Sequence, residues 1–85
     1  MIRIRKNQTG KRIGDEWVLL NLENGAYYGL NPTASLIWEE LVKGKEFEAV
    51  VDRLQKEFQT DRRKLERDLS EFLKELKEAG FVEEG

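Results

Sequence analysis

The residues that most often perform catalysis are missing from this 85-residue chain. It contains no histidine and no cysteine, which removes the commonest general base, the commonest metal ligand and the thiolate nucleophile. Two serines, Ser35 and Ser70, have no histidine partner to activate them. The glycines form no phosphate-binding pattern. We therefore expect no catalytic residue, no metal site and no cofactor, and a protein that is not an enzyme.

A second chemistry to weigh is nucleic-acid binding, because basic residues gather at the start of the last helical segment. They are Arg62, Arg63, Lys64 and Arg67. Such side chains could contact phosphates or base edges. Acidic residues follow on the same segment, and the net charge is −2, so DNA would repel much of the surface. A winged-helix DNA-binding protein is therefore kept as the alternative, and no nucleic acid is expected as a partner.

The extended elements that could carry a binding site lie in the first third of the chain. Ile2–Arg5 alternates apolar and basic residues and predicts a short strand. Asn7–Gly10 is interpreted as a turn or loop, after which residues 11–14 resume an extended path. Trp17–Leu22 is the strongest strand, apolar on both faces for most of its length, so we expect it to be central. Ala26–Leu30 returns as its partner after a tight Asn-Gly turn.

Three amphipathic helices are predicted in the rest of the chain. The first runs over Pro32–Lys43, with Asn31 as its N-cap and proline at its first position. The second runs over Phe47–Phe58. The third runs over Arg62–Ala79, with Asp61 as its N-cap. In each, apolar residues recur every three or four positions, which gives one face suited to a core.

Strands followed by helices indicate an α+β fold in a single domain. A small three-stranded antiparallel sheet followed by three helices predicts a winged helix-turn-helix arrangement. Glu39 and Glu40 are expected on the outer side of the first helix. Phe81 returns towards the body, and the tail residues Glu83 and Glu84 are expected to fray.

The edge of the sheet predicts a peptide-binding site. If Trp17–Leu22 is central, the neighbouring strand has one open side, and its backbone can pair with an extended peptide. Tyr28 and Leu30 share a face and would border a pocket against the third helix, with Leu69 and Phe72 on its other wall. The competing interpretation, that these residues are ordinary core, is favoured for Leu69, Leu76 and Trp38. For Tyr27 and Tyr28, whose rings are amphipathic, the two interpretations are equally supported.

Several segments, which cover roughly residues 17–82, carry a family likeness. They are Leu20-Asn21-Leu22, Tyr27-Tyr28-Gly29-Leu30-Asn31-Pro32-Thr33-Ala34, Ile37-Trp38, Asp68-Leu69, Phe72-Leu73, Leu76 and Gly80-Phe81-Val82. Together they resemble the signature of the PqqD-like family.

The resemblance implies a RiPP recognition element, a non-catalytic domain that binds the leader of a ribosomally made precursor peptide. In that family the leader adds as a strand beside the third strand of the wing and lies in a cleft against the third helix. On this chain those elements are Ala26–Leu30 and Arg62–Ala79. The expected leader-binding residues are Ala26, Tyr27, Tyr28, Gly29, Leu30, Arg63, Arg67, Asp68, Leu69 and Phe72. Arg63 and Arg67 are assigned to acidic leader residues from charge and position alone.

The expected partners are a precursor leader peptide and a peptide-modifying enzyme or leader peptidase. The family serves radical-SAM pathways such as pyrroloquinoline quinone synthesis and lasso-peptide pathways, and we favour the lasso type. A homodimer through the edge strand is a third alternative. No apolar run is long enough to span a membrane, so we expect no membrane partner and a cytoplasmic location.

Overall fold

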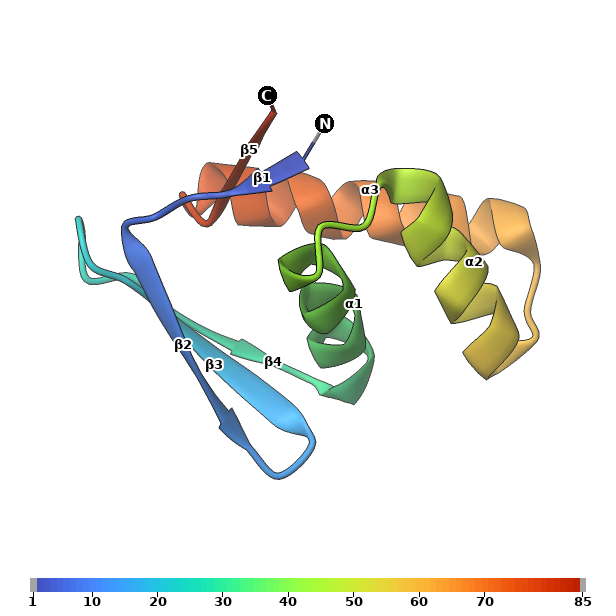
Figure 1. Cartoon of the computed structure of the whole chain (residues 1–85), viewed down its shortest axis with the longest axis horizontal. Coiled ribbons are helices and arrows are strands. Elements are labelled where there is room, and N and C mark those ends of the chain that lie inside the picture. Colours follow the sequence, from blue (N-terminus) through green and yellow to red (C-terminus); the bar gives the residue numbers. More distant parts are fainter. Residues whose placement is uncertain (1, 85) are drawn as a thin grey trace.

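The structure is a computed structural model that describes residues 2–84, and its chain forms an α+β fold with two small sheets and three helices (Figure 1). The elements, in chain order, are β1 (Ile2–Ile4), β2 (Gln8–Ile13), β3 (Glu16–Asn21), β4 (Tyr27–Leu30), α1 (Pro32–Val42), α2 (Phe47–Phe58), α3 (Arg62–Glu78) and β5 (Val82–Glu84).

The larger sheet is antiparallel, in the order β2-β3-β4, which confirms the predicted three-stranded sheet with β3 at its centre. The expectation of a loop over Asn7–Gly10 was wrong for most of that stretch, because β2 begins at Gln8. Gln8 pairs with Asn21 and Gly10 with Leu19, so the ladder supplies backbone partners that a turn would have left to water.

The two ends of the chain form a second sheet that was not predicted. β1 pairs antiparallel with β5, in a register that places Ile4 opposite Val82. Glu83 and Glu84 therefore belong to a strand, and the expectation that they fray was wrong. Lys77 Nζ lies 2.9 Å from Glu84 Oε1, which adds an ion pair to the ladder.

The helix boundaries follow the predicted caps. Asn31 Oδ1 accepts a 2.8 Å hydrogen bond from the Ala34 N–H at the start of α1. Asp61 Oδ1 accepts a 3.1 Å hydrogen bond from the Arg63 N–H at the start of α3. Each cap satisfies a backbone N–H that the first turn leaves without a partner. α2 has the predicted bounds, and α1 and α3 each end one residue earlier than predicted.

The core lies where the helices meet one another and one face of the large sheet. Its most deeply buried large side chains include Leu19, Trp38, Leu76 and Phe81. Glu40 was expected outside but is only 5% exposed. Its carboxylate lies 3.1 Å from Lys43 Nζ and 3.7 Å from the Arg53 guanidinium, so α1 and α2 bury it as a paired charge.

Candidate functional site

Strand β4 has an open edge. Its inner side pairs with β3, and no other strand of residues 2–84 pairs with its outer side. The Asn21 N–H donates a 2.8 Å hydrogen bond to the Ala26 carbonyl, so these two residues form a hydrogen-bonded pair of the antiparallel ladder. This pair determines which of the following residues of β4 are hydrogen-bonded to β3. In an antiparallel pair, backbone groups point alternately towards and away from the partner strand. Tyr28 and Leu30 therefore direct their N–H and C=O groups at β3, whereas Tyr27 and Gly29 direct theirs at the open edge.

Ser35 completes the far end of this ladder, and sequence analysis missed that role. Its hydroxyl accepts a 2.8 Å hydrogen bond from the Trp17 N–H and lies 3.2 Å from the Leu30 carbonyl, to which it donates. The side chain is 1% exposed. A buried serine in the first turn of α1 thus ties the helix to both strands and fixes where the β4 edge ends.

Tyr28 links the edge strand to α3. Its hydroxyl donates a 2.7 Å hydrogen bond to Glu75 Oε2, and its ring meets Phe81 edge-on, with centroids 6.1 Å apart. The hydrogen bond to Glu75, together with burial and the negative charge of that carboxylate, raises the pKa of Tyr28 to about 12. Tyr28 is therefore a neutral hydrogen-bond donor at ordinary pH. Glu75 was not predicted as a site residue, because its partner lies on a strand far away in the sequence.

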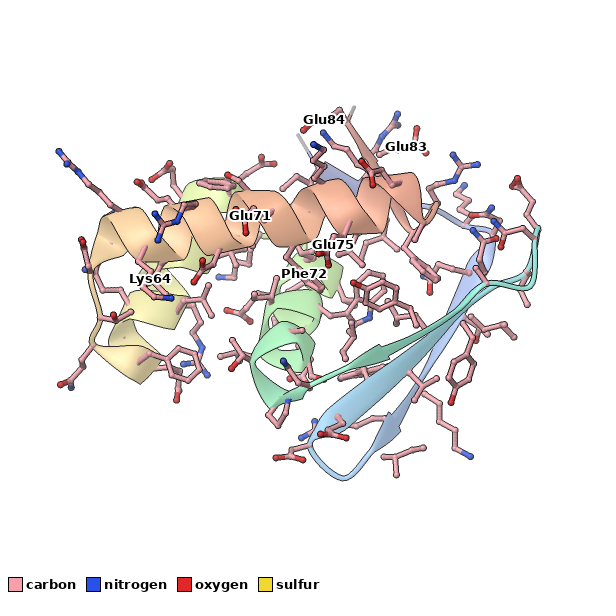
Figure 2. All side chains as sticks on the ribbon, turned by 180° about the vertical axis from the view of Figure 1, so that it is seen from behind. Lys64, Glu71, Phe72, Glu75, Glu83 and Glu84 are labelled. Atoms are coloured by element: carbon pink, nitrogen blue, oxygen red, sulfur yellow. The ribbon has the colours of Figure 1, made fainter. Side chains whose placement is uncertain are left out.

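The side of α3 that carries Glu75 also carries Phe72. Figure 2 shows both side chains extending from α3 towards the side where β4 lies. Phe72 is half-buried against the core, so part of its ring is accessible. Leu30 and Leu69 are 3% and 1% exposed, and both belong to the core. They support the surface from beneath, while Tyr28 and Phe72 form its accessible apolar part.

The charges along this side of α3 are mainly negative. Asp68 and Glu71 lie one to two turns before Glu75, at spacings that place them on the same side of the helix. Asp68 accepts a 2.8 Å hydrogen bond from Lys64 Nζ, which lowers the pKa of Asp68. Glu71 is exposed. The surface beside β4 thus combines an aromatic ring with carboxylates.

The two basic residues predicted to contact the leader, Arg63 and Arg67, lie on a different side of α3 from Glu75. An α-helix turns by about 100° per residue, so Arg67 is displaced by about 80° from Glu75, and Arg63 by about 120°. Both are exposed. The structure therefore brings Arg67 to the border of the surface and places Arg63 well away from it. Tyr27 is 73% exposed and points to the opposite face of the sheet from Tyr28.

Asn21 holds the end of α3 against the sheet. Its side-chain N–H donates a 3.0 Å hydrogen bond to the Ala79 carbonyl, and its Oδ1 accepts one of 2.9 Å from the Glu23 N–H. The residue is 2% exposed. Together with the bond between Tyr28 and Glu75, this contact fixes the position of α3 relative to β4.

Two of the four basic residues in the DNA-binding alternative are already paired. Arg62 lies 2.8 Å from Glu48 and 2.7 Å from Asp52, and Lys64 bonds Asp68. Their charge is therefore largely neutralised within the protein.

Within residues 2–84, no group of three or more acidic, histidine or cysteine side chains is arranged to hold a metal ion. No helix in this part of the chain is long and apolar enough to cross a membrane.

A family model described as "Coenzyme PQQ synthesis protein D (PqqD)" matches residues 16–82, which is most of the chain. The chain belongs to the PqqD family. The match includes the open strand, the capped α1 and the whole of α3. As a PqqD-like domain the protein is a binding module, and the expectation that it is not an enzyme is confirmed.

Two solved structures are similar to this protein over nearly the whole chain. "TbiB1 in Complex with the TbiA(beta) Leader Peptide" is 38% identical, with a TM-score of 0.95, covering 98% of this chain and 96% of that one. "Lasso peptide synthetase B1 complexed with the leader peptide" is 31% identical, with a TM-score of 0.89, covering 98% of both chains. No curated protein matches the sequence. The predicted resemblance and fold class are both confirmed.

Proposed function

We propose that this protein binds the leader segment of a ribosomally synthesised precursor peptide and presents it to the enzyme that modifies or cleaves that peptide. The observation that carries the proposal is the open edge of β4, which lies beside the accessible side of α3. The two similar structures were both solved with leader peptides. The cytoplasm, where precursors are synthesised, is the compartment that this function implies.

A lasso-peptide pathway is favoured over pyrroloquinoline quinone synthesis. The family model takes its description from the latter, but the relative described as a lasso peptide synthetase component is 31% identical over 98% of this chain. A 38% identical relative also binds a leader peptide. We therefore assign the enzyme partner to the lasso class, as a leader peptidase or another maturation enzyme.

Backbone pairing supplies the sequence-independent part of the proposed binding. Tyr27 and Gly29 each offer one N–H and one C=O at the open edge, so a leader running alongside β4 extends the sheet by one strand. Side chains of a strand alternate between its two faces. Every second leader residue would therefore face α3, beside Tyr28 and Phe72. Burying two apolar leader side chains there would supply about 3–6 kcal/mol, offset by the cost of ordering the peptide.

The charges on α3 add a preference to this binding mode. Glu71 and Glu75 favour a leader that carries a basic or hydrogen-bond-donating side chain next to its apolar ones. Arg67 lies at the border, where it could meet a leader acid, and Arg63 is the less favoured of the two predicted basic contacts. These assignments are tested by charge reversal at each position.

The experiment that tests the function is an amide-resolved NMR titration with synthetic TbiA(beta) leader peptide, with a scrambled peptide of the same composition as control. We expect shifts in β4 and on the Phe72 side of α3. The scrambled peptide, which retains only the sequence-independent backbone pairing, should cause much smaller shifts at the same concentration. Equal shifts with both peptides, or shifts confined to the β1–β5 pair, would contradict leader binding at this edge.

A further inference from the structure

The face of the large sheet turned away from the helices is apolar. Residues that alternate with the buried ones along β2, β3 and β4 form this outer sheet face, and its large apolar members are Ile13, Val18, Leu20, Leu22 and Tyr27. Ile13 is 61% exposed, Leu22 62% and Tyr27 73%. The helices lie to one side of the sheet, and no element of residues 2–84 covers the other (Figure 1).

An exposed antiparallel sheet normally has polar residues on its solvent face. A contiguous apolar patch on a small domain indicates a surface that another molecule covers. The proposed leader site does not account for this patch, because the leader would occupy the edge of β4 and face α3. The outer sheet face therefore requires an occupant of its own.

We propose that the outer sheet face binds a second copy of this chain, in a two-fold arrangement in which the strands of the two sheets run antiparallel. The pattern of large and small residues along β4 fits this geometry. Tyr27 and Gly29 are neighbours on the face, and the space above Gly29 is open, with nothing within 4 Å of where a Cβ would lie. The two-fold axis lies in the plane between the two sheets and runs perpendicular to the strands. Where it passes midway between Tyr27 and Gly29, it places each Tyr27 over the Gly29 of the other copy.

The same axis matches the other strands. It passes midway between Val18 and Leu20 at the centre of β3, so each of these apolar residues meets the other across the interface. On β2, Lys11 lies opposite Thr9 instead of directly opposite its own copy. Near the axis, large residues thus face small ones or fill the middle, which is what packing of two sheet faces needs. At the two ends of the face, Ile13 lies level with Asn7 of the other copy and Leu22 lies level with Glu16.

The charges at the two ends of the face are complementary under this axis. One end carries Asp15 and Glu16, at the turn between β2 and β3. The other end carries Lys6, Arg5 and Glu23: Asn7 accepts a 2.7 Å hydrogen bond from the Leu22 N–H through its carbonyl, and its side chain bonds the Glu23 carboxylate, which also lies 3.4 Å from Arg5. Arg5 offsets the charge of Glu23, so Lys6 leaves this end with a net positive charge. Antiparallel stacking places the acidic end of each copy against the net positive end of its partner.

This dimer leaves the β4 edge open and is independent of the proposed leader binding. It also differs from a dimer formed by pairing of edge strands, because the contact is between faces. Since the face is three short strands wide, we expect reversible association that depends on protein concentration, without leader peptide.

Sedimentation velocity from low micromolar to millimolar protein tests the proposal. We expect wild type to shift from monomer to dimer. Leu20→Ser should weaken dimerisation by about tenfold or more, because it places a polar group at the centre of the interface. Val42→Ser is the matched control: Val42 is 58% exposed on α1, away from this face, so its dimerisation should equal that of wild type.

A charge swap makes the test independent of any folding defect. Glu16→Lys and Lys6→Glu should each weaken dimerisation, and the double variant should restore it, because the swapped ends again attract. A monomer at every concentration, or a double variant weaker than both single variants, would overturn the proposal. Dilution-dependent NMR shifts confined to the β4 edge would overturn it in favour of strand pairing. Leader affinity, measured in parallel, should not change in Glu16→Lys.

Discussion

The hydroxyl of Tyr28 donates a 2.7 Å hydrogen bond to Glu75, and this bond joins the edge strand of the sheet to the last helix. The two residues are 47 positions apart in the sequence. Their contact defines one end of the surface on which we place the leader peptide. It fixes the Glu75 carboxylate beside β4, where it is ready to meet a donor group on an incoming strand.

Replacing Tyr28 by phenylalanine should weaken leader binding without unfolding the protein. The ring and its contact with Phe81 remain, but Glu75 loses the donor that orients it. Loss of one such bond costs about 0.5–1.5 kcal/mol, so we expect leader affinity to fall about threefold to tenfold. Fluorescence polarisation with labelled TbiA(beta) leader measures this. Tyr27→Phe, which removes a hydroxyl from the opposite face, should bind as wild type does. Equal affinity for both variants would remove the Tyr28–Glu75 pair from the site.

The raised pKa of Tyr28 predicts an alkaline loss of stability. Folding raises this pKa from 10.0 to about 12, so the folded state binds the phenolic proton more tightly than the unfolded state does. The resulting stabilisation is complete below pH 10 and is lost as the pH rises towards 12. Phenolate absorbance of the Tyr27→Phe variant reports Tyr28 alone. With Glu75→Gln added, we expect the titration to move down towards 10.0, and an unmoved titration would rule out Glu75 as the main cause.

Gly80 should be less replaceable than Gly44, although both have similar backbone conformations. Their φ angles are +83° and +85°, so alanine is strained at either position. A Cβ at Gly80 would lie 2.6 Å from the Asn21 side-chain nitrogen, whereas one at Gly44 meets nothing within 4 Å. We therefore expect Gly80→Ala to reduce the free energy of unfolding by about 1 kcal/mol or more beyond Gly44→Ala. Urea unfolding measures both. Equal losses would mean that Asn21 moves aside without cost.

Much of the fold was predictable because its signals are local. Asn31 and Asp61 cap helices through bonds within three residues, and the apolar spacing of α2 gave its bounds directly. The pairing of β1 with β5 could not be predicted, since it joins the two ends of the chain. Glu40 was misplaced for a related reason: its burial depends on Arg53 from the next helix, which no spacing rule within α1 reveals.

The candidate site was predictable only in part. The open edge of β4 follows from the central position of β3, which composition indicated. The roles of Ser35 and Glu75 depend on contacts across the fold, with Trp17 and Tyr28 respectively, so no local pattern could assign them. Leu69 was suggested as a pocket wall, yet it is 1% exposed and belongs to the core. The side of α3 that faces the core adjoins the side that faces β4, so apolar spacing along the helix does not separate the two.

The alternation of backbone groups along β4 gives the sharpest test of strand addition. In the free protein the Tyr28 and Leu30 amides face β3 and should exchange slowly with deuterium, whereas the Tyr27 and Gly29 amides face the open edge and should exchange fast. Bound leader should slow Tyr27 and Gly29 and leave the other two nearly unchanged, because a new strand pairs with every second residue. Amide-resolved exchange by NMR, with and without TbiA(beta) leader, measures all four. Leader binding that leaves Tyr27 and Gly29 fast would show that side chains alone hold the peptide, and that β4 does not pair with it.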